Sequence, residues 1–307
     1  TGFVGSHLTK RLIDLGAHVI VPVRGSNFRS YFFSTKLNEK TILVNCDIKD
    51  FQRVKDIIVK YEVKVVFHLA AQSLVTVAKK EPFETLMTNI SGTINVLESC
   101  RLNPDVEAIL LASSDKAYGT SPILPYLETC SLKGDYPYDV SKSCMDLISQ
   151  SYYKTYVMPL AIARFGNIYG EGDLNFNRIV PGGIKAGLLD STLDIRSDGN
   201  MVREYLYVQD VVNGYLAMAE NIGNIKGEAF NFSSIEKLRV VEVIDSISKA
   251  MNKNISRKIL GIANCEINEQ CLSSEKAKRL LNWKCQYKLD SILPKIIDWY
   301  RQYFNSQ

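Results

Sequence analysis

At residues 108–112 the chain reads AILLA, and the polar segment SSDKAYG follows directly at 113–119. A strand that is apolar at every position is typical of a parallel sheet with helices on both faces. Further short apolar runs occur at 18–23, 41–44, 63–69 and 160–164. Amphipathic helical stretches separate these runs, at 4–16, 51–61, 84–102 and 138–156. Strands that alternate with helices predict an α/β fold with a doubly wound parallel sheet of the Rossmann type.

The pattern changes after about residue 170. Residues 173–203 are rich in Gly, Asp and Asn, and helical stretches follow near 240–251, 274–281 and 290–304. We therefore divide the chain into a Rossmann domain at 1–170 and a smaller, interleaved C-terminal lobe at 171–307. We expect some segments of the lobe to return to the sheet.

Composition narrows the class of protein. The chain has 307 residues, 46% of them hydrophobic, and a net charge of +4, which excludes a disordered chain and argues against a nucleic-acid partner. We find neither the run of roughly 18 apolar residues that a membrane span needs nor a secretory signal pattern. The seven cysteines form no CxxC pair, so we expect reduced thiols, no metal site and a cytoplasmic protein.

Two glycines, Gly2 and Gly5, open the first helical stretch, with Phe3 and Val4 between them. Glycines at a helix start let backbone N–H groups approach a pyrophosphate, whose charge the helix dipole favours. The same spacing also occurs at the start of ordinary helices. The apolar strand that follows at 18–23 favours the nucleotide interpretation. Because such a turn normally follows a strand, and Thr1 lies inside it, we expect the first strand and the first glycine to be missing from the chain.

Arg24 stands at the end of the strand at 18–23, where an acid that bonds an NAD ribose is expected. An arginine there can hold the 2′-phosphate of NADP, or it can lie solvated in a loop, so both NAD and NADP stay open as the cofactor. Asp47 and Ile48 follow the next strand and suit contacts to an adenine. Asp47 can equally cap the helix that begins there.

Polar or small residues follow three elements whose ends meet at one edge of the sheet. Open α/β sheets bind ligands at the carboxyl ends of their strands. The first segment is His68-Leu69-Ala70-Ala71-Gln72, whose small residues leave room for a cofactor. The second contains Ser114, Asp115 and Lys116, and the third is the Y-x-x-x-K of Tyr138 and Lys142.

Tyr138 and Lys142 are four residues apart, so they share one face of a helix. A tyrosine has a pKa near ~10 and is a poor base at neutral pH, but a neighbouring cation favours its phenolate. A surface Tyr–Lys pair is the alternative interpretation. The serine-rich segment at the end of the preceding strand favours the catalytic one.

Several motifs in this order resemble those of the extended short-chain dehydrogenase/reductases, specifically the sugar-nucleotide dehydratases and epimerases. The resemblance spans nearly the whole chain, and its motifs are 1–8, 68–72, 88–93, 138–142, 164–170, 203–210, 274–277 and 281–283. It implies a bound NAD or NADP in the Rossmann domain, a nucleoside-diphosphate hexose held mainly by the 171–307 lobe, and a homodimer formed through helices 84–102 and 138–156.

The pair Asp115-Lys116 is most similar to the corresponding segment of CDP-glucose 4,6-dehydratases. For such an enzyme the resemblance implies that Tyr138 takes the proton of the sugar 4-hydroxyl while Ser114 holds the same oxygen. Lys116, if neutral, removes the C5 proton, and Asp115 protonates the departing 6-hydroxyl. An Asp115–Lys116 ion pair without an acid–base role is the alternative. The rival activities are a 4-epimerase, a sugar-nucleotide reductase and a non-catalytic nucleotide-binding protein.

The remaining candidates concern the substrate. Arginine grips phosphate with two hydrogen bonds, so Arg203 and Arg178 are expected to hold the diphosphate, although Arg178 can equally be solvated. Gln72 and Asn167 are expected to contact the substrate as well. The nucleobase and the hexose stay open.

Overall fold

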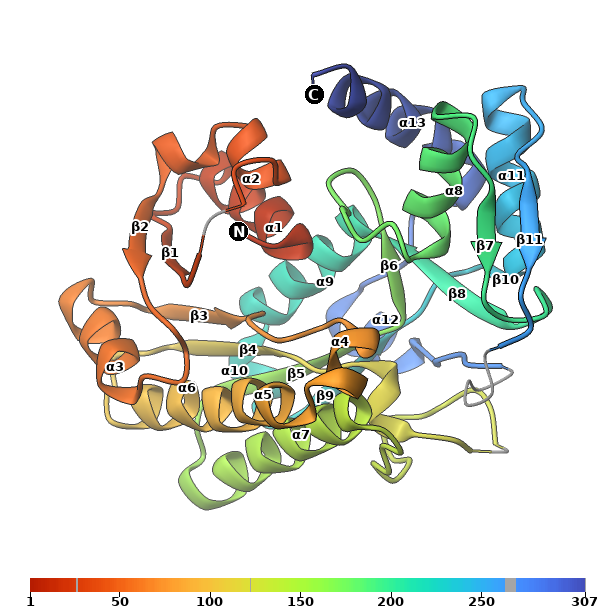
Figure 1. The fold of residues 1–307 in the computed structure, drawn as a ribbon. Helices are drawn as coiled ribbons and strands as arrows, with labels where there is room; N and C mark the ends of the chain where they lie inside the picture. The colour runs from red at the N-terminus through yellow and green to blue at the C-terminus, as the bar shows by residue number, and fades with distance from the viewer. Residues whose placement is uncertain (26, 122, 263–268, 307) are drawn as a thin grey trace.

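The computed structural model describes residues 1–25, 27–121, 123–262 and 269–306 (Figure 1). Its centre is a parallel four-stranded sheet with the order β3-β4-β5-β9. The strands are β3 (Val65–His68), β4 (Ala108–Ala112), β5 (Leu160–Phe165) and β9 (Ala229–Phe232). The expected Rossmann-type α/β fold is confirmed.

Residues of β4 alternate between two cores, which explains why this strand is apolar throughout. Ala108 and Leu110 belong to one core, and Ile109 and Leu111 to the other. The helices α1 (Phe3–Asp14) and α9 (Val208–Glu220) cover the first face, and the second is covered by α3 (Phe51–Lys60), α6 (Gly92–Arg101) and α7 (Pro137–Tyr156) (Figure 1). The carboxyl ends of the strands are left free to carry a site.

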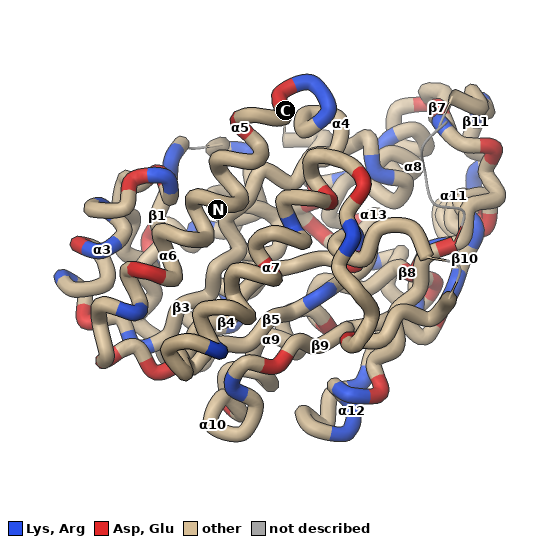
Figure 2. Tube along the Cα trace, turned by 90° about the horizontal axis from the view of Figure 1, so that it is seen from below, with Lys and Arg blue, Asp and Glu red and all other residues tan. Residues whose placement is uncertain are grey.

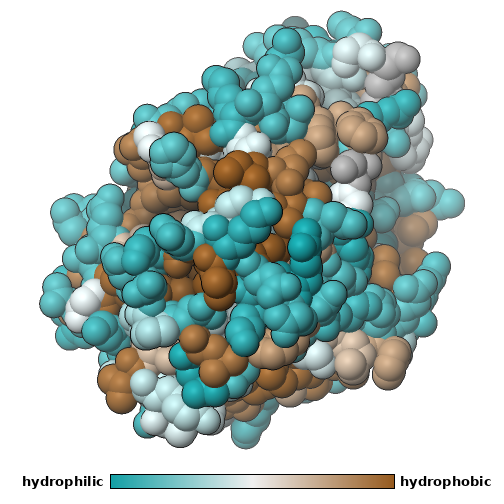
Figure 3. Space-filling view, turned by 90° about the vertical axis from the view of Figure 1, so that its left-hand side faces the viewer, coloured by the Kyte–Doolittle hydropathy of each residue, from teal (hydrophilic) through white to brown (hydrophobic). Residues whose placement is uncertain are grey.

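A second parallel pair stands apart from this sheet. It consists of β1 (Ile20–Val23) and β2 (Ile42–Asn45), joined by α2 (Tyr31–Ser34) and a 3₁₀ turn at Leu37–Lys40. In the described part of the chain no ladder joins β1 to β3. Ile42 and Leu43 of β2 and Val65 of β3 are exposed. Figure 3, which views the molecule from the left-hand side of Figure 1, shows apolar side chains at the surface of that side.

The stretch predicted as one helix at 84–102 has three parts. They are α5 (Pro82–Leu86), a π-helical turn at Met87–Ser91, and α6, with α4 (Val75–Lys80) before them. The Asn89 amide of the π turn reaches back to the loop after β3, accepting from the Gln72 backbone N–H at 2.8 Å and donating to the Gln72 carbonyl at 3.0 Å. Such π-helical turns are frequent at functional sites.

The C-terminal lobe, together with the segment directly before it, contains two small sheets. One has the order β10-β8-β6, with β6 (Asn167–Tyr169), β8 (Val202–Tyr207) and β10 (Lys237–Arg239), and the other pairs β7 (Leu193–Ile195) with β11 (Arg257–Ile259). The helices α8 (Ile179–Leu188), α11 (Val240–Met251) and α13 (Leu289–Asn305) pack around a separate core. The helix α10 (Ile222–Ile225) follows α9, and α12 (Glu275–Leu281) packs on β9.

Charged residues and cysteines are both scattered along the described part of the chain. On the side shown in Figure 2, basic and acidic residues alternate over both lobes. Among the helices that the structure describes, none is long and apolar enough to cross a bilayer. The described cysteines are all free thiols, while Cys265 lies outside the described residues.

Candidate active site

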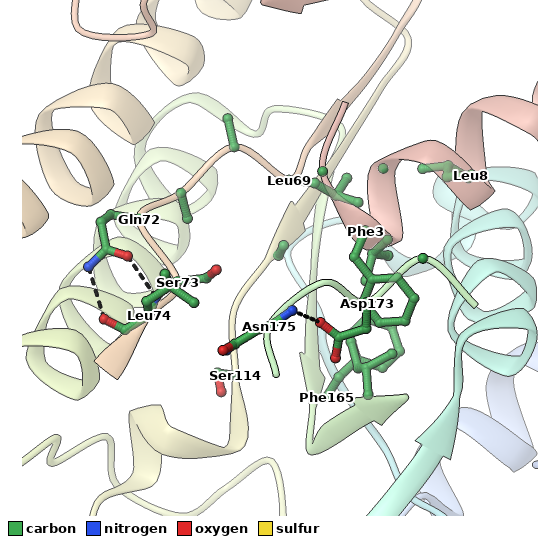
Figure 4. Close-up of a pocket in the computed structure, with 18 of the residues that line it drawn as sticks. Phe3, Leu8, Leu69, Gln72, Ser73, Leu74, Ser114, Phe165, Asp173 and Asn175 are labelled. Carbon is green, nitrogen blue, oxygen red and sulfur yellow. Dashed lines mark hydrogen bonds between the residues drawn. The ribbon is translucent and has the colours of Figure 1, made fainter. Parts of the chain in front are cut away.

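A large cavity lies between the carboxyl ends of β3, β4 and β5 and the C-terminal lobe (Figure 4). All of the predicted site residues line it. They come from the start of α1, from the ends of β1, β2, β3 and β4, from α7, and from the lobe segments before α8 and within β6 and β8. The same cavity extends between β1 and β3, so the individual contacts described below decide which residues act together.

The start of α1 is open toward the cavity. Gly2 caps the helix, the first turn carries no acidic residue, and a Cβ atom added at Gly2 or Gly5 would meet no atom within 4 Å. After β3, the small residues Ala70 and Ala71 continue the same cavity wall beside Leu69. Exposed backbone N–H groups at the positive end of a helix, next to small residues, fit the pyrophosphate of a dinucleotide.

The Arg24 side chain is 61% exposed and lies beside two carboxylates. Its guanidinium is 3.5 Å from the Glu84 carboxylate and 3.9 Å from that of Asp47. Glu84 also accepts from Lys49 at 2.7 Å. Asp47 does not cap α3, because Asp50 holds that position and accepts from a backbone N–H of the first turn. Ile48 packs against Gly92 of α6.

Ser114 and Asp115 begin a 3₁₀ turn, Asp115–Tyr118, directly after β4. The Ser114 hydroxyl donates to the Asp115 carboxylate at 2.9 Å and accepts from the Lys116 backbone N–H at 3.2 Å. Burial, followed by the Asp115 charge, raises the pKa of Tyr138 to about 12, while the Ser114 hydroxyl and Arg178 lower it. The expectation of a lowered pKa is therefore wrong for the free protein.

Lys142 is buried one helical turn from Tyr138. Its ammonium donates to the Ala112 carbonyl at 2.6 Å and lies 3.6 Å from the Met145 sulfur. Burial lowers the pKa of Lys142 to about 8, with Asp146 acting in the opposite direction. A lysine with this pKa still carries most of its positive charge at pH 7 and can therefore favour the phenolate of Tyr138.

The side chain of Lys116 points to a residue that the motifs did not include. Its ammonium donates to the Oε1 atom of Gln270, so the Asp115–Lys116 ion pair considered above is not what holds it. Two buried carboxyl groups lie nearby. Burial raises the pKa of Asp139 to about 6, against the charge of Lys116, and raises that of Glu204 to about 7.

The residues predicted to bind substrate already make hydrogen bonds or ion pairs within the protein, and these contacts differ from residue to residue. Gln72 is folded onto its own loop, as Figure 4 shows, and its amide exchanges hydrogen bonds with Leu74. Asn167 donates to the Glu204 carbonyl at 3.3 Å. Arg178 pairs with the buried Asp173 at 3.0 Å, and Arg203 is buried with one donor on the Val202 carbonyl at 2.8 Å.

Residues 172–175 of the loop at 170–175 line the cavity, and the C-terminal helix holds this loop in place. Lys295 of α13 binds the Glu171 carboxylate at 2.9 Å. The Tyr300 hydroxyl donates to the Asp173 carbonyl at 2.6 Å. On the opposite side, the buried His7 ring of α1 contacts the Glu171 carbonyl at 2.7 Å. The loop therefore joins the first helix of the chain to α13.

The sequence model of the NAD dependent epimerase/dehydratase family matches residues 1–232. The chain belongs to this family. CDP-glucose 4,6-dehydratase from Salmonella typhimurium is 27% identical over 324 residues, covering 100% of this chain and 90% of that protein. UDP-glucuronate 4-epimerase from Thermodesulfobacterium geofontis is also 27% identical, over 275 residues that cover 87% of this chain and 81% of that protein.

A solved structure of a sugar-nucleotide epimerase has the same fold as this chain. UDP-glucose 4-epimerase from Thermotoga maritima, crystallised with UDP-glucose, superimposes with a TM-score of 0.90 at 25% identity, over 99% of this chain and 97% of that one. Members of the epimerase/dehydratase family are NAD-dependent sugar-nucleotide enzymes. The open start of α1 in this member fits such a cofactor.

Sequence reasoning missed Gln270, Lys49 and Glu84. Gln270 is 154 positions from Lys116, and nothing in its neighbourhood resembles a motif. Glu84 was included only as part of a helix. Glu204, in contrast, stands within the quoted motif at 203–210, and its position directly after Arg203 was a signal that could have been used.

Proposed function

We propose that this family member is a sugar-nucleotide 4,6-dehydratase that converts a nucleoside-diphosphate hexose into its 4-keto-6-deoxy derivative and water. The observation that carries the proposal is the acid–base pair Asp115-Lys116 directly beside Ser114 and within the cavity that Tyr138 lines. An epimerase needs only the oxidation site, whereas elimination of water across C5 and C6 needs a further base and a further acid.

NAD or NADP, tightly bound, would supply the redox chemistry by taking up hydride from C4 and returning it to C6. The phenol of Tyr138 is protonated in the free protein, since its pKa is about 12. We propose that in the complex it releases this proton to solvent and then accepts the proton of the sugar 4-hydroxyl. Ser114 donates a hydrogen bond to the same oxygen. Lys142 and Arg178 supply the positive charge nearby.

The 4-ketone acidifies the C5 proton, which Lys116 removes. Asp115 protonates the 6-hydroxyl as it leaves as water, and Lys116 gives its proton back to C5 when hydride is returned to C6. Arg203 and Arg178 hold the diphosphate, with Arg178 exchanging its contact with Asp173 for a phosphate oxygen. Gln72 and Asn167 contact the hexose. Because the proposed cycle returns the hydride, the cofactor is not consumed.

We also propose that the enzyme is a homodimer formed through the 84–102 and 138–156 helices. Phe83 and Met87 on the outer side of α5 and its π turn are exposed, as is Leu147 on α7. Apolar side chains on neighbouring helices form the kind of surface that a second copy covers.

The test is to incubate the protein, without added cofactor, with CDP-, dTDP-, UDP- and GDP-hexoses. A 4-keto product, detected by its absorbance in alkali, is expected with one of them. The Lys116→Ala variant should still oxidise C4 but lose elimination by about 10²-fold or more, and Tyr138→Phe should lose both steps. An inverted C4 configuration without a ketone would favour the 4-epimerase, and stoichiometric cofactor consumption would favour a reductase.

A further inference from the structure

Residues 269–273 of the C-terminal lobe, which we call the strap, run beside the catalytic turn of the Rossmann domain. The strap is fixed by its backbone, because the Cys271 carbonyl accepts from Tyr126 N–H at 2.9 Å and the Tyr126 carbonyl accepts from Ser273 N–H at 3.0 Å. Leu272 N–H donates to the Glu204 carboxylate at 3.0 Å. The Gln270 backbone N–H itself donates to the Val202 carbonyl at 3.4 Å, so the position of Gln270 is set by main-chain contacts of the strap.

Only one of the two polar atoms of the Gln270 side-chain amide makes a hydrogen bond with the described residues. Its Oε1 atom accepts from the Lys116 ammonium, while its Nε2 atom is buried without a hydrogen-bond partner in the part of the chain that the structure describes. The residue is only 2% exposed. A buried unpaired donor costs about 1–3 kcal/mol. Packing alone would favour an apolar side chain at this buried position. The presence of glutamine therefore points to a role for its Oε1 atom, the acceptor of the Lys116 hydrogen bond.

We propose that Gln270 is a positioning residue that holds the Lys116 amine in the cavity through a neutral acceptor. This inference rests on the proposed function, in which Lys116 removes the C5 proton. An amide oxygen orients the amine without adding charge, whereas a carboxylate in the same place would favour the ammonium form, which cannot act as a base.

Several charged groups surround Lys116, so it is important that its hydrogen-bond acceptor, the Gln270 amide, is uncharged. Asp115 is its neighbour in the chain, and Asp139 of α7 interacts with its charge. Behind Asp115 lies the buried Glu204. On the strap side, Lys237 of β10 donates to the Cys271 thiol at 3.1 Å and lies 3.7 Å from Glu269. Another carboxylate against Lys116 would add to an already acidic environment.

The first measurement does not depend on activity. The full chain is labelled with trace acetic anhydride over a pH series, and the acetylation of Lys116 is followed by peptide mass mapping. We compare wild type with Gln270→Glu and Gln270→Met, and use Glu269→Gln as a strap variant that does not contact Lys116. Gln270→Glu should raise the pH of half-maximal labelling by about one unit or more, while Glu269→Gln leaves it unchanged.

The second measurement is the pH dependence of turnover, with C4 oxidation followed separately in a single turnover. Gln270→Glu should shift the rise of elimination activity to higher pH. Gln270→Met should lower kcat for elimination about tenfold, with KM and C4 oxidation nearly unchanged. The melting temperature of each variant checks its folding.

The outcomes separate the inference from the proposed function. If the labelling of Lys116 is the same in Gln270→Glu and wild type, or if Gln270→Met loses oxidation and elimination equally, the positioning role is wrong. If labelling shifts as expected but wild type makes no ketone from any hexose, the contact is correct and the dehydratase proposal is wrong.

Discussion

The carboxyl group of Glu204 shows how burial acts on single residues near the cavity. It accepts from the Ser233 hydroxyl at 2.8 Å and from a strap N–H, yet burial still raises its pKa to about 7. Tyr138 shows the same effect, because burial outweighs the groups that lower its pKa. The sequence could place Tyr138 and Lys142 on one helix face. It could not predict the direction of the shift, which depends on how deeply each group is buried.

The raised pKa of Glu204 predicts how stability depends on pH. The unfolded carboxyl has its ordinary pKa of 4.5, so the folded state binds the proton more tightly, and this stabilisation is lost as pH rises from 4.5 through about 7. The loss is about 3 kcal/mol in the free energy of unfolding. Glu204→Gln should remove it, so urea unfolding at pH 5 and pH 8 should differ less in the variant. Equal differences in the variant and wild type would contradict this, and Glu269→Gln is the control.

At the scale of elements, β5 and α7 are joined by a buried ion pair. The Arg164 guanidinium binds the Asp146 carboxylate with two hydrogen bonds of 2.8 and 2.9 Å and donates to the Tyr118 hydroxyl at 2.7 Å. Through Tyr118 the pair also supports the turn that carries Lys116. Helices and strands were predicted here to within about two residues from their apolar periodicity. The pairing of Arg164 with Asp146 could not be predicted from the sequence, because it depends on how α7 is rotated against the sheet.

Removing one member of this pair should be costly. We expect Asp146→Ala to lower the free energy of unfolding by about 3–5 kcal/mol, because it leaves the Arg164 charge buried without its partner. The double variant Asp146→Ala with Arg164→Met should lose less than the single variant. Glu98→Ala, which breaks the more exposed pair with Arg101, should cost about 1 kcal/mol or less. Urea denaturation measures all three, and similar losses for Asp146→Ala and Glu98→Ala would refute the argument.

For the whole molecule, the distribution of exposed apolar residues predicts the oligomeric state. Phe83 is 75% exposed and Leu147 is 52% exposed. A charge on the proposed dimer face should separate the subunits, so Phe83→Glu with Leu147→Glu should halve the mass measured by light scattering. Ile123→Glu is the control, because Ile123 is 72% exposed and lies on another segment. A wild type that is monomeric at micromolar concentration would contradict the dimer.

The sequence also predicted that residues from both lobes form one site, but it did not predict which lobe residues reach the catalytic turn. The strap approaches Lys116 from 154 positions away, and no local pattern specifies that contact.

The anchoring of the 170–175 loop by α13 has a consequence for synthesis. A ribosome adds Lys295 and Tyr300 only after every other element described here has been made. A chain that lacks α13 leaves Glu171 and Asp173 without these anchors. The order of the 170–175 loop, which lines the cavity, therefore depends on a helix that follows it by more than a hundred residues.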